Sequence, residues 1–259
     1  MLESLHISAT GMHTQQTYVD VISNNLANIN TMGFKKSRVD FADLMYRQAA
    51  TINGNLDLSA EQKPLGVGSS ISNVAKVFSA GEVKRTEREL DVAIDGNGFF
   101  EIVMPDGSYG YTRTGALQLN NEGVLATADN LLVSPLVQVP ADAESLVIKS
   151  DGAVMAKVVD RQQLIKIGEI ELAQFVNPSG LKPIGNNLYT PTHESGNVFY
   201  VGAGEDGAGV LRQGYLEASN VELVEELTGL ILAQRAYEIN SKVVQASDDM
   251  LGIINNLRR

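Results

Sequence analysis

The feature that most constrains this chain is an apolar repeat near its C-terminus. The apolar residues recur at alternating intervals of four and three, and they are Leu232, Ala236, Ile239, Val243, Ala246, Met250, Ile253 and Leu257. Because side chains at this spacing share one face of an α-helix, the repeat predicts a long amphipathic helix over residues 219–257. Ser219 and Glu222 have the spacing of a capping box, which places the predicted start of the helix at residue 219.

A second apolar stripe runs along a neighbouring face of the same predicted helix. Its members lie seven residues apart, and they are Leu223, Leu230, Tyr237, Val244 and Leu251. One stripe suffices to pack against one other helix, so two stripes predict contacts on two sides. We therefore expect the additional face to contact other molecules. The alternative is that the β-rich middle of the chain covers it.

The N-terminal residues predict a shorter and less regular helix. Residues 1–30 contain no proline and a single glycine, and their apolar stripe consists of Leu5, Met12, Val19 and Leu26, with Ile22 and Ile29 at the intervening positions. The helix is expected to end near Asn28, because Asn28, Asn30 and Gly33 are typical C-terminal stop signals. Phe34 would then fold back as an apolar anchor. With two stripes, the C-terminal helix is the better candidate for joining one subunit to the next.

The segment between the helices predicts β structure. Six of the seven prolines lie between residues 67 and 215, and turn dipeptides recur at Asn97-Gly98, Asp106-Gly107 and Asp151-Gly152. Short runs of β-branched and aromatic residues, such as 99–103 and 145–148, lie between the turns. The expected fold class is α+β, with terminal helices forming a coiled-coil-like layer that flanks an inserted all-β domain. The expected boundaries are an N-terminal helix at 1–34, an extended connecting segment at 35–70, the β domain at 71–215 and a C-terminal helix at 216–259.

Composition excludes several classes of function. The net charge of −11 and the absence of basic clusters argue against nucleic-acid binding. The chain has no cysteine, which removes disulfides, thiolate metal sites and cysteine nucleophiles. No apolar run is long enough for a membrane span, and the N-terminus lacks the pattern of a cleaved secretory signal. We therefore expect a protein that either stays in the cytoplasm or leaves it without such a signal.

The residues offer little for catalysis. His6 and His13 lie seven apart but have no third metal ligand at a useful spacing, and His193 lies beside Glu194 and Ser195 in a polar loop. We expect no catalytic, cofactor-binding or metal-binding residues, and no enzyme. A secreted β-domain hydrolase or glycan binder with helical dimerisation arms is the alternative, and it rests on His193 and its neighbours.

Five motifs resemble those of the bacterial flagellar rod and hook proteins, and together they cover nearly the whole chain. The first is the run 23–28, which includes Asn24, Asn25, Leu26 and Asn28, followed by Thr31, Gly33, Phe34 and Lys35. The others are Asp95–Phe100, Tyr111–Gly115, Gln213–Val221 and Gln234–Lys242. The chain length resembles that of a rod member and is too short for the hook protein. The segment from Tyr46 to about Gly68 resembles an extension that rod members carry.

This resemblance implies a structural subunit of the distal rod, with a proximal rod position as the alternative. It implies a helical tube that transmits motor torque to the hook, with the terminal helices inside and the β domain outside. The implied partners are other copies, proximal rod subunits, the hook protein, the bushing rings in peptidoglycan and outer membrane, and a type III export apparatus. The implied location is the part of the basal body that spans the periplasm, reached by export without a cleaved signal.

The expected assembly interface consists of apolar residues on the two helices. On the N-terminal helix they are Leu5, Met12, Val19, Ile22, Leu26 and Ile29. On the C-terminal helix they are Leu223, Leu227, Leu230, Leu232, Ala236, Tyr237, Ile239, Val243, Val244, Ala246, Met250, Leu251, Ile253 and Leu257.

Overall fold

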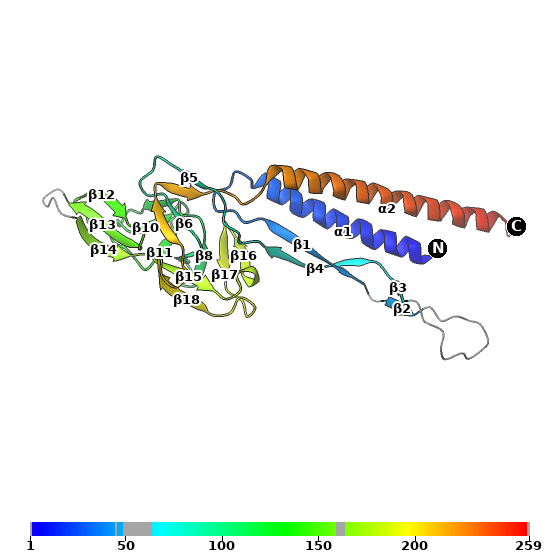
Figure 1. Ribbon diagram of the computed structural model, residues 1–259, viewed down its shortest axis with the longest axis horizontal. Helices are drawn as coiled ribbons and strands as arrows, with labels where there is room; N and C mark the ends of the chain where they lie inside the picture. The colour runs from blue at the N-terminus through cyan, green and yellow to red at the C-terminus, as the bar shows by residue number, and fades with distance from the viewer. Residues whose placement is uncertain (1, 45, 49–63, 159–163, 258–259) are drawn as a thin grey trace. The chain divides into compact units, whose positions relative to one another are not determined.

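The two predicted helices are present at the ends of the chain, and the segment between them is all β (Figure 1). A computed structural model describes residues 2–44, 46–48, 64–158 and 164–257. The predicted α+β fold class is confirmed. The chain divides into a helical unit, comprising Met1–Leu26, Ser37–Ala75 and Glu222–Arg259, and a β unit, comprising Ala27–Lys36 and Lys76–Val221. Residues 27–36 therefore group with the β unit, although the sequence suggested a boundary after residue 34.

The helical unit contains two long helices and a two-stranded ribbon. Its elements are α1 (Leu2–Ala27), β1 (Ser37–Asp43), β2 (Tyr46–Gln48), β3 (Pro64–Gly66), β4 (Ser69–Lys76) and α2 (Leu223–Leu257). Strand β1 pairs with β4, and β2 pairs with β3. Most of the extension suggested for residues 46–68 lies outside the described residues. No helix in the described part of the chain is apolar over a length that would cross a membrane.

Helix α1 lies between α2 and the β1/β4 ribbon (Figure 1). On the ribbon side, the ring of Tyr18 meets that of Phe41 edge-on at 5.6 Å between centroids. The Thr14 hydroxyl lies 3.3 Å from that of Ser69. Contacts on both sides explain why the apolar stripe of α1 is irregular, since polar side chains such as Thr14 bond to the ribbon.

Helix α2 begins at Leu223, so the prediction of a capping box at Ser219 is wrong. The Ser219 hydroxyl accepts a hydrogen bond from the nearby Val221 N–H at 3.3 Å, but residue 219 lies outside the helix. The physical reason is a competing set of bonds on the next residue. The Asn220 side chain bonds to the backbone of Lys36 and Val77, which ties residue 220 to these two segments before the helix begins.

The β unit is built from antiparallel sheets. Its strands are β5 (Val83–Arg85), β6 (Val92–Asp95), β7 (Phe100–Val103), β8 (Tyr109–Thr112), β9 (Leu117–Leu119), β10 (Leu125–Thr127), β11 (Leu132–Ser134), β12 (Ala143–Ile148), β13 (Ala153–Val158), β14 (Leu164–Glu169), β15 (Glu171–Phe175), β16 (Lys182–Gly185), β17 (Leu188–Thr190), β18 (Val198–Gly202), β19 (Val210–Gln213) and β20 (Tyr215–Glu217), with a 3-10 turn at Pro178–Gly180. The largest sheet has the order β16-β17-β8-β7-β11-β10-β9, and a three-stranded sheet has the order β12-β13-β14. The remaining pairs are β15-β18, β19-β6 and β20-β5.

Two apolar clusters form the core of the β unit. The larger cluster is aliphatic around Phe100, and Ile102, Leu117 and Leu172 are fully buried in it. The smaller cluster is aromatic and contains Phe99, Tyr111, Phe175 and Tyr189. Its rings meet edge to face, the arrangement that the ring quadrupoles favour.

The Gln213 side chain joins the three-stranded sheet to the rest of the β unit. Its amide nitrogen donates to the carbonyl oxygens of Leu146 at 2.7 Å and Glu89 at 2.8 Å. Its amide oxygen accepts from the Ile148 N–H at 3.0 Å. An amide can donate and accept at once, so it substitutes for a neighbouring strand along the edge of β12.

Candidate assembly site

The face of α2 that contacts α1 is narrow and mostly polar or small. It is marked by Glu226, Ala233, Asn240 and Ser247, which lie seven residues apart; Glu226, Ala233 and Ser247 are buried. Glycines allow close approach along this contact. A Cβ on Gly11 would lie 2.9 Å from the Asn240 amide nitrogen, and one on Gly229 would lie 3.1 Å from the Tyr18 hydroxyl. The helices therefore pack closely without a continuous aliphatic seam.

Asn25, a residue of the N-terminal motif, ties three elements of the helical unit together. Its side-chain nitrogen donates to the Ser37 carbonyl at 2.9 Å and lies 3.3 Å from both carboxylate oxygens of Glu226. Its side-chain oxygen accepts from the Ser37 N–H at 2.8 Å. The residue is 2% exposed, so these partners satisfy an amide that would otherwise be buried at a cost. An amide with both donors and an acceptor is required here, because no other small side chain serves both β1 and α2.

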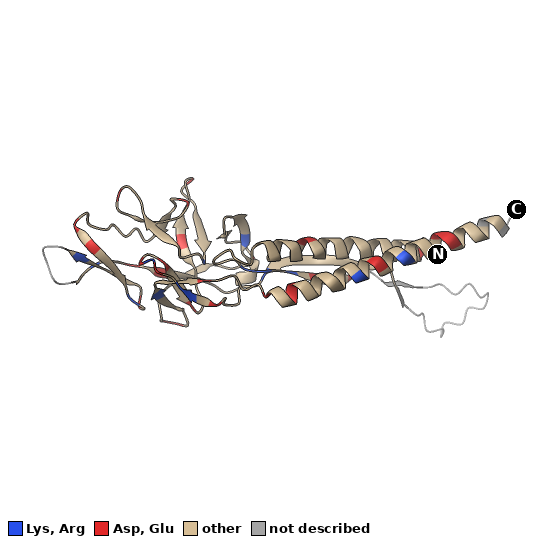
Figure 2. Ribbon diagram, turned by 90° about the horizontal axis from the view of Figure 1, so that it is seen from above, with Lys and Arg blue, Asp and Glu red and all other residues tan. Residues whose placement is uncertain are grey.

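The opposite flank of α2 carries most of the predicted first stripe, and it is exposed. We call this surface the apolar ridge and define it as Leu232, Ile239, Val243, Met250 and Ile253, which are 64%, 61%, 40%, 48% and 59% exposed. Ala246 is also exposed, Ala236 is half-buried, and the side chain of Leu257 lies outside the described residues. Helix α1 carries only two charged residues, Glu3 and Asp20, whereas charged residues recur along α2 (Figure 2). A contiguous exposed apolar surface of this kind is typical of a protein interface.

The remaining predicted interface residues fall into three groups by exposure. Ile22 is buried, while Leu5, Met12, Val19, Leu26, Ile29, Leu230, Val244 and Leu251 are half-buried. Leu223, Leu227 and Tyr237 are 48%, 40% and 45% exposed. Ile22 lies close to Gly229 of α2, so its packing is internal to the chain. The second stripe thus lies largely beside α1, whereas the first faces away from it.

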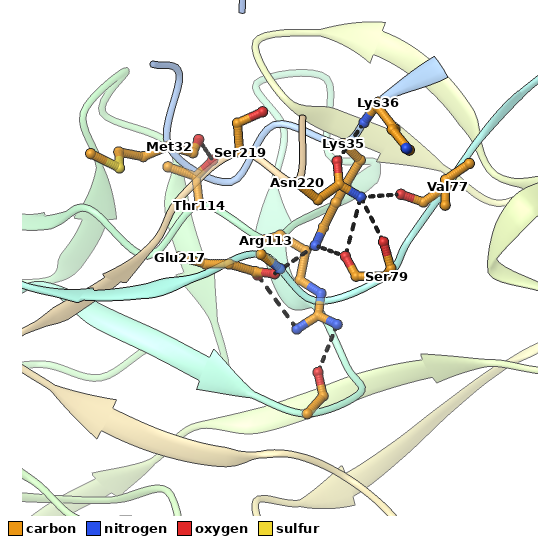
Figure 3. A network of polar contacts seen from close by, with 12 residues as sticks. Met32, Lys35, Lys36, Val77, Ser79, Arg113, Thr114, Glu217, Ser219 and Asn220 are labelled. Carbon is orange, nitrogen blue, oxygen red and sulfur yellow. Dashed lines mark hydrogen bonds and ion pairs between the residues drawn. The ribbon is translucent and has the colours of Figure 1, made fainter. Parts of the chain in front are cut away.

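A polar network in the β unit joins three segments from the sequence motifs to a fourth segment that lies outside them (Figure 3). We call it the signature junction and define it as residues 33–36, 76–81, 113–114 and 217–220. At its centre the Lys35 ammonium contacts Glu217 Oε1 at 2.5 Å and donates to the Ser79 carbonyl at 2.7 Å. The same carboxylate oxygen accepts from the Gly81 N–H at 2.8 Å. The side chains of Lys35 and Glu217 are 0% and 1% exposed, so water does not screen the pair.

Arg113 is a second buried cation beside the same carboxylate. One guanidinium nitrogen lies 3.7 Å from Glu217 Oε2, and another donates to the Gly96 carbonyl at 2.7 Å. Its guanidinium also lies 5.4 Å from the centre of the Phe99 ring. One carboxylate therefore compensates two buried cations. Burial lowers the pKa of Lys35 despite the opposing effect of Glu217, and burial lowers the pKa of Arg113 in the same way.

Asn220 closes the junction on the side of the C-terminal motif. Its side-chain oxygen accepts from the Lys36 N–H at 2.7 Å, and its nitrogen donates to the Val77 carbonyl at 2.8 Å. The ammonium of Lys76 donates to the Lys35 carbonyl at 2.9 Å and lies over the Phe34 ring at 4.4 Å. Phe34 is buried under this cation.

Gly33 is the residue whose backbone this junction constrains most. Its φ angle is +70°, which disfavours other residues, and its N–H donates to the Glu217 carbonyl at 2.7 Å. A Cβ here would lie 2.7 Å from the Thr114 hydroxyl oxygen and 3.0 Å from the Thr114 nitrogen. The Thr114 hydroxyl in turn donates to the Met32 carbonyl at 3.3 Å. Both the backbone conformation and the space therefore require glycine.

Sequence reasoning did not find the ion cluster of the junction. Lys35, Arg113 and Glu217 all lie within the quoted motifs, yet each resembles an ordinary surface charge in the sequence. The usable signal is that Arg113 and Glu217 sit in runs of otherwise uncharged residues, whereas Lys35 lies beside Lys36 and carries no such signal.

Because Tyr189 is buried in the aromatic cluster, its ionisation is predicted to destabilise the β unit at high pH. Burial, and secondarily the Glu217 charge, raises the pKa of Tyr189 to about 12. Between the ordinary pKa of about 10 and this value, the unfolded chain loses the phenol proton and the folded chain keeps it. The stabilising contribution is therefore complete below pH 10 and is lost as the pH rises through 12. Between pH 10 and pH 12 the free energy of unfolding should fall in both proteins. We expect the fall to be about 2–3 kcal/mol smaller in Tyr189→Phe than in the parent, as measured by urea unfolding at each pH.

Other tyrosines with raised pKa values are present in both proteins, so the difference isolates Tyr189. Tyr109→Phe is the control, because Tyr109 is 52% exposed. Equal losses of stability in the parent and in Tyr189→Phe would contradict the assignment.

The residues considered as catalytic candidates from the sequence are Ser195 and its neighbours His193 and Glu194. Ser195 is buried, and its hydroxyl donates to the Thr192 carbonyl at 2.8 Å, which closes its own loop. That engagement gives no support to the hydrolase alternative built on His193 and Glu194. Among the described residues, no group of three or more His, Asp or Glu side chains could hold a metal ion.

Comparison with known families identifies the class of protein. A model described as flagella basal body rod protein matches residues 5–35, and one described as flagellar hook protein FlgE/F/G D1 domain matches residues 93–156. A third, described as flagellar basal body rod FlgEFG protein C-terminal, matches residues 212–257. These three matches follow the order of α1, the β unit and α2. They place the fold in the class of axial proteins of the flagellar rod and hook.

Similarity to individual proteins narrows the class. The chain is 42% identical over 264 residues to the flagellar basal-body rod protein FlgG of Borreliella burgdorferi, with all of both chains covered. It is 40% identical to FlgG of Bacillus subtilis and 31% identical to the flagellar hook-basal body complex protein FlhP of the same organism, again over the full length of each. The chain therefore belongs to the FlgG family of flagellar basal-body rod proteins. The family is structural, and the predicted resemblance is confirmed.

Proposed function

We propose that the protein is a structural subunit of the distal flagellar rod and that it polymerises through its terminal helices. The observation that carries this proposal is the apolar ridge, which α1 leaves uncovered while the other stripe of α2 packs beside α1. Exposing this much aliphatic surface has no use in a protein that stays monomeric, and burying it releases about 25 cal/mol per Å². Full-length identity to proteins named FlgG supports the rod as the assembly.

A distal rather than a proximal rod position is part of the same proposal. The relatives from Borreliella burgdorferi and Bacillus subtilis, which are 42% and 40% identical over their full length, carry the FlgG name, which supports the distal position. In this position the tube would transmit motor torque to the hook. Its neighbours would be proximal rod subunits, the hook protein, and the bushing rings of the peptidoglycan and outer membrane.

Export and location complete the proposal. The absence of cysteine is compatible with passage of an unfolded chain into an oxidising compartment, since no thiol can mispair. We propose that a type III apparatus exports the protein without cleaving a signal, and that the assembled rod spans the periplasm. In this proposal the protein has no enzymatic activity and inserts into no membrane.

The test is assembly of the purified full-length protein. Concentrated protein should form hollow tubes of uniform diameter in electron micrographs, and light scattering should rise above a critical concentration. A protein that stays monomeric at all concentrations, with or without short rod fragments as seeds, would overturn the proposal.

A further inference from the structure

A polar cavity lies within the helical unit, between α1 and the β1/β4 ribbon. Its volume is about 430 Å³. Helix α1 forms one wall, and the residue after β1 together with the first residues of β4 forms the other. The lining residues are Thr10, His13, Thr14, Thr17, Leu44, Ser69, Ser70 and Ile71. Most of them carry a hydroxyl group, so the directions of the hydroxyl protons decide what the cavity can bind.

The hydroxyl protons of the three threonines are committed to α1 itself. Thr10, Thr14 and Thr17 each donate to a carbonyl oxygen three or four residues earlier in the helix, at 2.8, 2.9 and 3.2 Å. A carbonyl oxygen can only accept, and a hydroxyl has a single proton to give. Each of these oxygens therefore has only lone pairs left, and lone pairs accept hydrogen bonds.

The two serines of the ribbon are committed in the same way. The Ser69 hydroxyl lies 3.3 Å from that of Thr14. Because the Thr14 proton is already donated to the helix, Ser69 must be the donor of this bond. The Ser70 hydroxyl donates to the Ala42 carbonyl at 3.5 Å. All five hydroxyl groups therefore present acceptors to the cavity.

The ribbon side of the cavity combines close approach with apolar surface. Gly68 precedes the lining residues of β4 and has a φ angle of +128°, and a Cβ there would collide with the Thr10 hydroxyl oxygen. Leu44 and Ile71 add aliphatic side chains to the lining. A hollow with hydroxyl acceptors and an aliphatic wall suits a ligand that has a donor head and a short hydrocarbon part.

The charges closest to the lining in sequence are negative. Asp43 is the last residue of β1, directly before a lining residue, and Asp20 lies about one turn of α1 beyond Thr17. The cation of β1, Arg38, is paired with Asp40 at 3.0 Å. A negative surrounding potential favours a cationic donor over a neutral one. Among cationic donors, an ammonium group has three N–H donors and no acceptor, which matches a set of acceptors.

We propose that this cavity binds the primary ammonium group of a small alkylamine. Its N–H donors pair with the hydroxyl oxygens, and its hydrocarbon part lies against Leu44 and Ile71. The site goes beyond the proposed function and does not depend on it. Because the lining comes from both α1 and the ribbon, a bound ligand holds these elements together and stabilises the folded chain.

The test uses n-butylammonium and the full-length protein at a concentration too low for assembly. A titration followed by ligand-observed NMR should saturate, and the melting temperature in circular dichroism should rise with the ligand concentration. Butyltrimethylammonium has the same charge without an N–H donor, and butan-1-ol has a donor without the charge. Both should bind at least about tenfold more weakly. Potassium chloride at equal ionic strength should leave the melting temperature unchanged.

The double variant Thr10→Val/Thr17→Val tests the location of the site. Valine keeps the shape of threonine but removes the acceptor oxygen, so the affinity for n-butylammonium should fall at least about tenfold. Thr228→Val is the matched control. The Thr228 hydroxyl also donates to a carbonyl of its own helix, at 2.7 Å, but Thr228 does not line the cavity. This variant should bind n-butylammonium as the parent does.

Four results would each overturn the inference. They are a titration that does not saturate, equal binding of butyltrimethylammonium, an equal rise in melting temperature with potassium chloride, and an unchanged affinity in a folded double variant. None of these results bears on the assembly of the rod, so the two proposals fail separately.

Discussion

Ile239→Asp should leave a folded chain that no longer assembles. Ile239 is 61% exposed in the single chain, so an aspartate there is hydrated and circular dichroism should show unchanged helix content and melting temperature. Assembly would transfer the carboxylate into an apolar contact, at a cost of about 3 kcal/mol or more. That cost corresponds to a rise of at least about 100-fold in the critical concentration, measured by sedimentation or light scattering.

The matched control is Ile239→Met, which keeps an apolar side chain of similar size at the same place. This variant should assemble within a few-fold of the parent concentration. If the aspartate variant assembled as readily as the methionine variant, the ridge would not be an intersubunit surface.

Glu217→Gln should destabilise the β unit more than any other conservative change in it. The substitution keeps the shape and keeps an oxygen for the Gly81 N–H, but it removes the carboxylate that lies beside Lys35 and Arg113. Leaving buried cations without a counter-charge costs about 3–5 kcal/mol. Thermal unfolding, followed by the tyrosine signal in near-ultraviolet circular dichroism, should show a strongly lowered melting temperature.

A double variant separates loss of charge from loss of packing. In Glu217→Gln/Lys35→Met one of the two cations is gone as well, so the double variant should be more stable than the sum of the two single effects predicts. Additive effects, or a Glu217→Gln variant within about 1 kcal/mol of the parent, would show that the buried ions do not depend on one another.

Only part of the helical unit could be predicted from the sequence. The repeat of apolar residues predicts α2 because its spacing is a local property of the chain, and the cluster of asparagines near residue 28 predicts the end of α1, which the structure places at Ala27. The start of α2 was predicted wrongly. The local capping signal at Ser219 competes with bonds from Asn220 to residues far away in the sequence, and those bonds prevail.

The signature junction was the part of the structure that could be predicted least from the sequence. The motifs could be recognised from the sequence, but Lys35 and Glu217 lie 182 positions apart, and no local pattern pairs them. Their burial removes both from water and makes each depend on the other. Gly33 is an intermediate case, because a glycine after a helix suggests positive φ, whereas the contact with Thr114 appears only in the folded chain.

The sequence by itself determined that the C-terminal helix has two apolar stripes, one more than packing against a single helix requires. Helical periodicity is sufficient for this, because it assigns each apolar residue to a face of the helix. It could not determine which stripe stays exposed. Only the tertiary structure decided that, through two glycines and a row of small and polar residues that bring α1 against the face at Glu226, Ala233 and Ser247. Close approach of backbones favours small side chains at a contact, so the more regular aliphatic stripe was left facing away from α1, where a second copy can reach it.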